Sequence, residues 1–107
     1  MTDLALETGI GNEIMTSLIK VFKSTPNLDE VIVFGSRAKG NYSEGSDIDL
    51  AIKGKNITIE TVLGLMSEID RLDLLYKVEI QNYDAISNDD LREHIDRAGK
   101  TLWRRTK

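Results

Sequence analysis

Apolar residues recur along the chain with two different periods, which predict helices alternating with strands. Helical spacing governs residues 12–24, a segment that ends before Pro26. Its apolar positions are Ile14, Leu18, Val21 and Phe22. Four consecutive apolar residues, Val31 to Phe34, then stop at Gly35, which is typical of a short strand buried on both faces. The pattern therefore predicts a helix that covers a sheet, followed by a strand over residues 30–34.

The middle of the chain continues this alternation. Residues 47–53 and 76–81 are predicted to form a second and a third strand, because apolar and polar residues alternate in them. Thr58 is the predicted N-cap of a helix between these strands. The apolar positions assigned to the buried face of this helix are Ile59, Val62, Leu63, Met66, Ile69 and Leu72. A helical crossover makes the two strands parallel, so that they can be neighbours in one sheet.

A last helix is predicted to begin near Ser87. Its buried stripe consists of Leu91, Ile95, Ala98 and Leu102. Trp103 and the basic residues after it, Arg104, Arg105 and Lys107, are interpreted as a tail that complements the helix dipole or docks a partner. The chain thus reads as a single α/β domain over residues 1–107, in the order α-β-α-β-α-β-α, with a three-stranded mixed sheet.

Composition narrows the class of protein. A chain of 107 residues can form a core without disulfides, and the absence of cysteine excludes a disulfide scaffold, a cysteine zinc site and thiol catalysis. No apolar run is long enough for a membrane span and no signal peptide is evident, so we expect a cytoplasmic protein. The net charge of −4 argues against direct nucleic-acid binding, which usually needs a basic surface.

Two acids, Asp47 and Asp49, stand at the start of the predicted second strand. Residues i and i+2 of a strand point to one face, about 7 Å apart, so both carboxylates aim the same way. Acids at this spacing repel each other, and Mg²⁺, which prefers oxygen ligands, removes the repulsion. Glu79 of the third strand falls on the same polar face if the two strands are neighbours. The sequence therefore predicts an open acidic cleft on the sheet face away from the helices.

Gly35 and Ser36 directly follow the first strand and are candidates for phosphate binding. Glycine lets backbone approach a ligand closely, and the amide and hydroxyl of Ser36 can donate hydrogen bonds to phosphate oxygens. Arg37 and Lys39 are further candidates, because a basic pair can contact a triphosphate; the alternative for both is an ordinary solvated turn. His94, the single histidine, has no ligand partners at metal spacing and is interpreted as a helix surface residue without function.

The spacing of these residues resembles a known family signature. Gly35-Ser36, ten residues and then Asp47-Ile48-Asp49 is similar to the signature of the DNA polymerase beta-type nucleotidyltransferase superfamily. The segments GSRAKG and GSDIDLAI, in so short a chain, resemble its minimal nucleotidyltransferase (MNT) branch. Members of that branch are usually antitoxins of all-helical HEPN proteins. The resemblance covers the chain from residue 28 onward and implies the minimal nucleotidyltransferase fold.

The resemblance also implies a reaction, the transfer of AMP from ATP to a hydroxyl with release of pyrophosphate. Asp47 and Asp49 would hold two Mg²⁺ ions, and Gly35 and Ser36 would hold the triphosphate. Glu79 stands where the family usually has Asp, and would complete one metal site and help to deprotonate the acceptor. Because 107 residues leave no room for an acceptor-binding domain, we expect a partner protein to supply the acceptor. The resemblance implies a tyrosine hydroxyl of a HEPN RNase toxin, which the modification silences.

Two other functions stay open. Because Glu79 departs from the usual Asp, the chain is alternatively a catalytically weak binding module that neutralises its HEPN partner by occlusion. A third interpretation is a detached catalytic domain of an aminoglycoside-type nucleotidyltransferase, which would label a small molecule instead of a protein. The enzyme hypothesis predicts that Asp47→Asn or Asp49→Asn abolishes label transfer yet leaves folding intact, whereas neutralisation by occlusion survives both changes.

Overall fold

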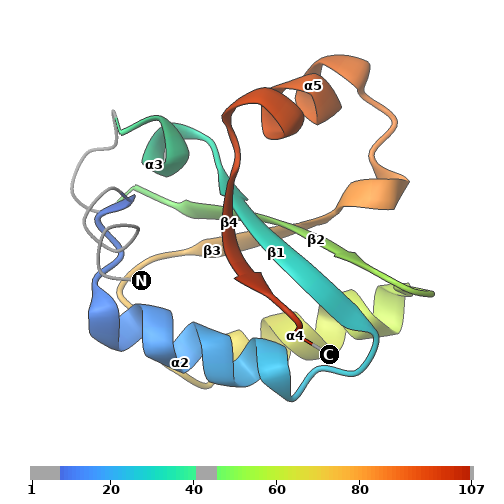
Figure 1. Cartoon of the computed structure of the whole chain (residues 1–107). Coiled ribbons are helices and arrows are strands. Elements are labelled where there is room, and N and C mark those ends of the chain that lie inside the picture. The colour runs from blue at the N-terminus through green and yellow to red at the C-terminus, as the bar shows by residue number, and fades with distance from the viewer. Residues whose placement is uncertain (1–7, 41–45, 107) are drawn as a thin grey trace.

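The computed structural model describes residues 8–40 and 46–106 as a four-stranded sheet with helices on both faces (Figure 1). The helices are α2 (Asn12–Lys23), α3 (Ser36–Lys39), α4 (Ile59–Asp70), the 3₁₀ helix η1 (Tyr83–Ala85) and α5 (Asp89–Ala98). The strands are β1 (Leu28–Phe34), β2 (Ile48–Gly54), β3 (Val78–Asn82) and β4 (Lys100–Arg104). They lie in the order β3-β2-β1-β4, with β2 parallel to β3 and β1 antiparallel to both β2 and β4. The predicted α/β class and mixed sheet are confirmed, but the sheet has four strands instead of three.

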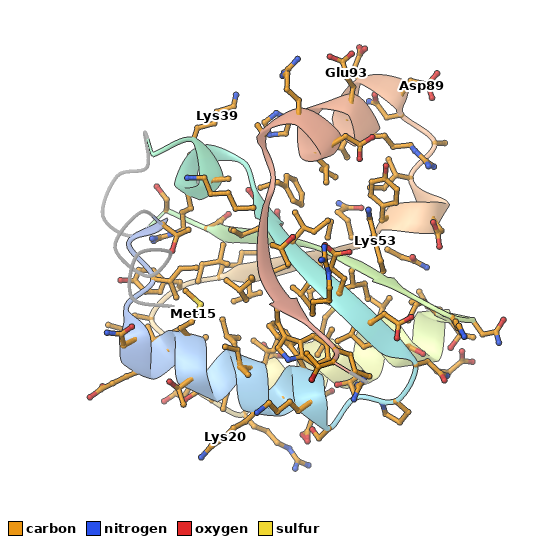
Figure 2. The ribbon with its side chains drawn as sticks, viewed as in Figure 1. Met15, Lys20, Lys39, Lys53, Asp89 and Glu93 are labelled. Carbon is orange, nitrogen blue, oxygen red and sulfur yellow. The ribbon has the colours of Figure 1, made fainter. Side chains whose placement is uncertain are left out.

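Helices α2 and α4 cover one face of the sheet and form the larger core with it (Figure 1). The residues that α2 buries are Met15, Leu18 and Phe22. Their spacing places them on one side of the helix, and Figure 2 shows Met15 extending from α2 toward the sheet. The strand residues of this core are Leu28, Val31, Val33, Ile48, Leu50, Ile52, Leu102 and Trp103. The role predicted for the first helix, covering one face of the sheet, is therefore confirmed.

Helix α4 begins where the sequence predicted, and Val62, Ile69 and Leu72 of its predicted buried face pack in the larger core. The hydroxyl of Thr58 accepts a hydrogen bond from the Thr61 amide at 3.3 Å, as expected of an N-cap. Leu65 and Ile69 are buried. Three residues assigned to the buried face are instead exposed: Ile59 (66%), Leu63 (55%) and Met66 (39%). The apolar side of this helix is wider than its contact with the sheet, so its period alone could not select which edge of that side is buried.

The second face of the sheet is partly covered, which corrects the prediction of an open cleft there. Helix α5 and η1 lie over this face and form a smaller core with it (Figure 1). The buried residues of this core are Ile32, Phe34, Ala51, Ile86 and Ile95. Because successive residues of β1 alternate between the two cores, all of Val31 to Phe34 are buried, as predicted.

The C-terminal segment forms strand β4, where the sequence predicted the end of a helix and a basic tail. The chain leaves α5 at Gly99 and returns along β1. A Cβ atom at Gly99 would lie 2.5 Å from the carbonyl oxygen of Ile95 and 2.6 Å from Cγ2 of Ile32, so this passage requires glycine. Trp103 is buried in the larger core, with its ring centroid 6.0 Å from that of Phe22. The predicted helical position of Leu102 and the predicted tail at residues 103–105 are therefore wrong, and Lys107 lies outside the described residues.

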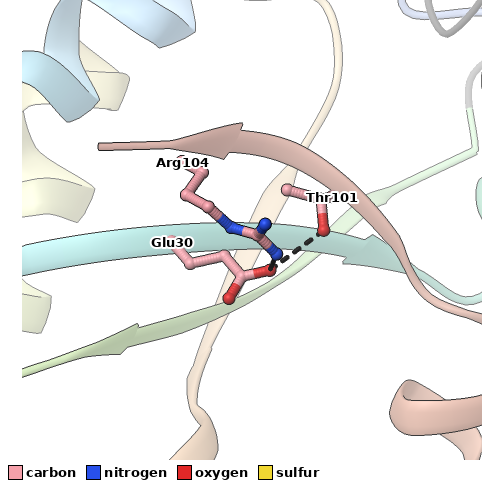
Figure 3. Close-up of polar contacts among 3 residues, drawn as sticks. All are labelled: Glu30, Thr101 and Arg104. Atoms are coloured by element: carbon pink, nitrogen blue, oxygen red, sulfur yellow. Dashed lines mark hydrogen bonds and ion pairs between the residues drawn. The ribbon is translucent and has the colours of Figure 1, made fainter. Parts of the chain in front are cut away.

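Polar contacts fix β4 beside β1. The Oε2 atom of Glu30 accepts a hydrogen bond from the Thr101 hydroxyl at 2.9 Å and pairs with Arg104 at 3.0 Å (Figure 3). Burial by itself would raise the pKa of Glu30, but the hydrogen bonds from Arg104 and Thr101 and the Arg104 charge hold it below its usual value. Arg105 donates from Nε to the Leu28 carbonyl at 2.8 Å. Arg104 and Arg105 therefore stabilise the position of β4 in the fold.

The prediction of a single domain over residues 1–107 stays a prediction, because both ends lie outside the described residues. Within the described ranges, no helix combines the length and the apolar character needed to span a membrane.

Candidate active site

The sheet register brings two of the predicted acids together. Strands β2 and β3 are parallel neighbours, and Asp49 stands directly beside Glu79 in their register. The amide of Ile48 donates to the Lys77 carbonyl at 2.8 Å and begins the pairing of the two strands at this end. The predicted parallel pairing, with Glu79 next to Asp49, is therefore confirmed. Asp47 lies immediately before β2 and is exposed.

The surroundings of Asp49 disfavour its negative charge. Partial burial raises the pKa of Asp49 most, and the carboxylates of Glu79 and Asp47 raise it further. A hydrogen bond with Glu79 acts in the same direction, because a bond between two carboxyl groups requires a proton on one of them. The site therefore favours a bound proton or cation over three bare negative charges.

The chemistry of these donors suits a hard divalent cation. Carboxylate oxygens are the ligands that Mg²⁺ prefers, and the repulsion around Asp49 is what a cation relieves. Glu79 also pairs with Nζ of Lys77 at 3.4 Å, in a largely exposed ion pair. Among residues 8–40 and 46–106, no three Asp, Glu, His or Cys side chains converge as a ready metal site. As they lie, the acids offer one close pair, Asp49 with Glu79, and the nearby charge of Asp47.

The turn between β1 and α3 lies against Asp49. In the antiparallel register of β1 and β2, Phe34 stands beside Asp49, so the turn that follows Phe34 is next to this acid. Gly35 has a φ of +77°, and a Cβ atom there would lie 2.5 Å from Oδ2 of Asp49. Glycine is therefore required both by the backbone conformation and by the close carboxylate. Ser36, half-buried, follows at the first position of α3.

His94 of α5 also reaches this turn, a contact that no local pattern in the sequence indicates. The amide of Gly35 donates a hydrogen bond to Nε2 of His94 at 3.3 Å. The His94 ring meets the ring of Phe34 edge-on, with centroids 6.2 Å apart. Burial, together with the charges of Lys39 and Arg97, lowers the pKa of His94. The interpretation of His94 as a helix surface residue overlooked this contact, because it joins residues 59 positions apart.

Arg37 lies in the interior, with 1% of its surface exposed. Its Nε and Nη2 atoms donate to the Ser46 carbonyl at 3.1 and 2.8 Å, and Nη1 donates to the Thr8 carbonyl at 2.8 Å. Its guanidinium lies over the ring of Tyr76, 4.5 Å from the centroid. The arginine therefore ties α3 to neighbouring backbone. Lys39, at the end of α3, is exposed and extends away from the sheet (Figure 2).

A comparison with protein families matches residues 16–107 to the family described as polymerase beta, nucleotidyltransferase. The chain belongs to the polymerase beta nucleotidyltransferase family. The matched range of this nucleotidyltransferase contains every predicted site residue, from Gly35 to Glu79. A search of curated protein sequences finds no match.

Solved structures similar to this nucleotidyltransferase include complexes of toxins with antitoxins. One is a toxin–antitoxin with AMP-PNP, at 23% identity and a TM-score of 0.69, covering 85% of this chain and 73% of that one. Another contains a tri-AMPylated HEPN toxin of Shewanella oneidensis in complex with an MNT antitoxin, at 21% identity and a TM-score of 0.63, covering 85% and 70%. A Sulfolobus solfataricus protein assigned as a nucleotidyltransferase aligns at 24% identity and a TM-score of 0.57, covering 95% and 88%. These likenesses establish a shared fold.

Proposed function

We propose that this nucleotidyltransferase transfers AMP from ATP to a hydroxyl of a HEPN partner protein and thereby neutralises a HEPN RNase toxin. The observation that carries the proposal is the meeting of the Gly35-Ser36 turn with the acids Asp49 and Glu79 at one end of the sheet. Hydrogen-bond donors for phosphate, next to carboxylates that attract a cation, are the two components that nucleotidyl transfer needs. The solved complexes with AMP-PNP, an ATP analogue, and with an AMPylated HEPN toxin support the choice of nucleotide and partner.

In this mechanism Asp47, Asp49 and Glu79 would hold Mg²⁺, which when bound would neutralise phosphate charge and favour in-line displacement at the α-phosphorus. Ser36 donates its amide and hydroxyl protons to the triphosphate and so orients it. Glu79 accepts the proton of the acceptor hydroxyl while the acceptor oxygen bonds to the α-phosphorus. The bond from this phosphorus to the leaving pyrophosphate breaks, and the partner carries AMP as a phosphate ester. We expect the reaction to take place in the cytoplasm, where ATP is available.

The two basic residues of α3 have different parts in the proposal. Lys39 is exposed, and we assign it to contact the phosphates from the solvent side. Arg37 is buried and holds the Ser46 carbonyl with two donors, directly before Asp47. We therefore assign Arg37 to the support of the acidic segment, in place of the direct nucleotide contact expected from the sequence.

The test follows label from α-phosphate-labelled ATP into a purified HEPN protein encoded beside this chain. With Mg²⁺, the unmodified chain is expected to label the partner, and Asp49→Asn is expected to lower the rate about 100-fold or more, because a group that stabilises transition-state charge is lost. Asp70→Asn, an exposed acid at the end of α4, is the matched control and should label normally. Normal transfer by Asp49→Asn would rule out the mechanism.

A second candidate function, neutralisation by occlusion, is favoured by two observations. No three acidic or other metal-binding side chains converge as a ready metal site within the described ranges, and Glu79 is engaged by Lys77. Occlusion predicts that the chain suppresses the RNase activity of its partner without any label, and that Asp49→Asn and Asp47→Asn suppress it equally well. Measuring both label transfer and RNase activity in the same preparations therefore distinguishes the two functions.

A further inference from the structure

A hydrogen bond from the Gly35 amide to Nε2 of His94, at 3.3 Å, joins α5 to the Gly35-Ser36 turn. We propose that His94 is a positioning residue, which accepts the Gly35 amide proton at Nε2 and thereby holds the turn in the conformation that receives the triphosphate. The inference rests on the proposed function, because it assigns the turn to nucleotide binding. None of the mechanistic steps above uses His94.

The turn needs an external support at this point. Gly35 has a φ of +77°, and its Cα lies so close to Asp49 that a Cβ atom would be 2.5 Å from Oδ2. On one side the turn therefore faces a carboxylate, and its amide points to the imidazole of His94. A partly buried amide without an acceptor is costly, so a turn without His94 would move to satisfy this donor elsewhere.

The imidazole is itself held in place. The next residue, Ile95, is 2% exposed and belongs to the smaller core, so α5 cannot slide over the sheet without disturbing that core. The edge-on contact with Phe34 limits rotation of the His94 ring. Burial and the nearby positive charges of Lys39 and Arg97 lower the pKa of His94 and so favour the neutral ring. The hydrogen bond from the Gly35 amide then selects the tautomer with its proton on Nδ1 and Nε2 as the acceptor.

Two amide substitutions separate this role from simple packing. In His94→Gln the side-chain oxygen stands as many bonds from Cα as Nε2 does, so it can accept the Gly35 proton. In His94→Asn the oxygen stands one bond nearer to Cα and falls short. Both variants remove the ring and its contact with Phe34, and both introduce the same amide group. A difference between the two variants therefore shows the effect of a hydrogen-bond acceptor at the ε position.

The experiment measures label transfer at varied ATP concentration for the full chain and both variants, with the HEPN partner and Mg²⁺. His94→Asn is expected to raise KM for ATP about 5- to 10-fold, the fold-change of one lost hydrogen bond, with kcat changed less than about twofold. His94→Gln is expected to stay within about twofold of the unmodified chain in both parameters. Equal KM values for the Gln and Asn variants would overturn the proposal.

Hydrogen exchange of the Gly35 amide provides a readout that needs no activity. We expect exchange at least about 10-fold faster in His94→Asn than in His94→Gln or the unmodified chain, because the acceptor is lost. Equal protection in all three proteins would overturn the positioning role. If the unmodified chain neither binds ATP nor transfers label, the proposed function fails, and the exchange rates still decide whether His94 holds the turn.

Discussion

Asp49 occupies a position that weakens the fold. Burial, together with the charges of Glu79 and Asp47, raises its pKa, so its ionised form is less favourable in the folded chain than in the unfolded one. The same carboxylate lies so close to Gly35 that no side chain fits there. Acids whose pKa is perturbed by burial and by neighbouring charges gather at functional sites more often than elsewhere, because a ligand can relieve the repulsion that the fold alone cannot.

Asp49→Asn should therefore stabilise the folded chain at neutral pH. The repulsion appears as pH rises through the raised pKa that Asp49 has in the folded chain. It is absent below the usual pKa of 3.8, where Asp49 is protonated in both the folded and the unfolded chain. We expect a Tm about 1–4 °C higher at pH 7, a modest gain because the site is partly solvated. The gain should vanish near pH 3. Thermal unfolding at several pH values checks this, and an equal gain at all pH values contradicts it.

Gly35→Ala should destabilise the chain more than Gly40→Ala. Both glycines have positive φ, but a Cβ atom at Gly40 meets nothing within 4 Å, whereas one at Gly35 meets the Asp49 carboxylate. We expect the free energy of unfolding to fall by about 1 kcal/mol in Gly40→Ala, because of the left-handed backbone, and by about 2–3 kcal/mol in Gly35→Ala. Urea unfolding measures both values. If the clash is responsible, the loss at Gly35 is smaller in an Asp49→Ala background, and an unchanged loss there argues against it.

At the scale of elements, the C-terminal segment shows where the hydrophobic pattern misleads. Leu102 continues the helical spacing of Leu91, Ile95 and Ala98, yet it lies in β4. The deciding residue is Gly99, which passes against the Ile95 carbonyl, where a side chain would collide. A glycine near the end of a helical pattern signals the end of the helix. Here that signal outweighs the helical spacing that continues to Leu102.

Gly99→Ala should therefore lower the free energy of unfolding by about 2–3 kcal/mol, because the added methyl group meets both Ile95 and Ile32. Gly64→Ala is the matched control. Gly64 lies in α4, where a Cβ atom meets nothing within 4 Å, so helix propensity should raise the free energy of unfolding by up to about 1 kcal/mol. Chemical denaturation compares the two, and a loss of stability in both variants would contradict the local explanation for Gly99.

At the scale of the whole molecule, two cores on opposite faces of one sheet hold the candidate site. The larger core joins the sheet to α2 and α4, and the smaller one joins it to α5 and η1. The acids and the turn extend from strand ends that both cores fix, while Asp47 and Glu79 stay exposed. A rigid sheet thus presents a reactive end to a ligand.

Mg²⁺ should raise the stability of the whole chain through these acids. A ligand at about 10 times its Kd stabilises the state that binds it by about 1.4 kcal/mol, so Tm should rise with Mg²⁺ concentration. Asp49→Asn should show little of this rise, and Asp70→Asn should show all of it. Differential scanning calorimetry measures the shift, and equal shifts in the two variants would place Mg²⁺ elsewhere.

Much of the site was predictable because its residues are close in sequence. Gly35 and Ser36 follow an apolar strand, and the alternation of β2 assigns Asp47 and Asp49 to one face. The position of Glu79 followed from a helical crossover between two strands. The predicted phosphate contact of Arg37 rested on charge alone. Charge cannot show that Arg37 is buried with its donors on backbone carbonyls.

By itself, the sequence determined the α/β class, the first strand buried on both faces, and the pairing of a glycine-serine turn with acids, because each of these follows from local period and spacing. Only the tertiary structure decided the fourth strand, the buried side of α4, the interior position of Arg37 and the contact of His94 with Gly35. These features depend on which surfaces meet, and that choice minimises exposed apolar area and unsatisfied polar groups over the whole chain. No short window of sequence contains that information.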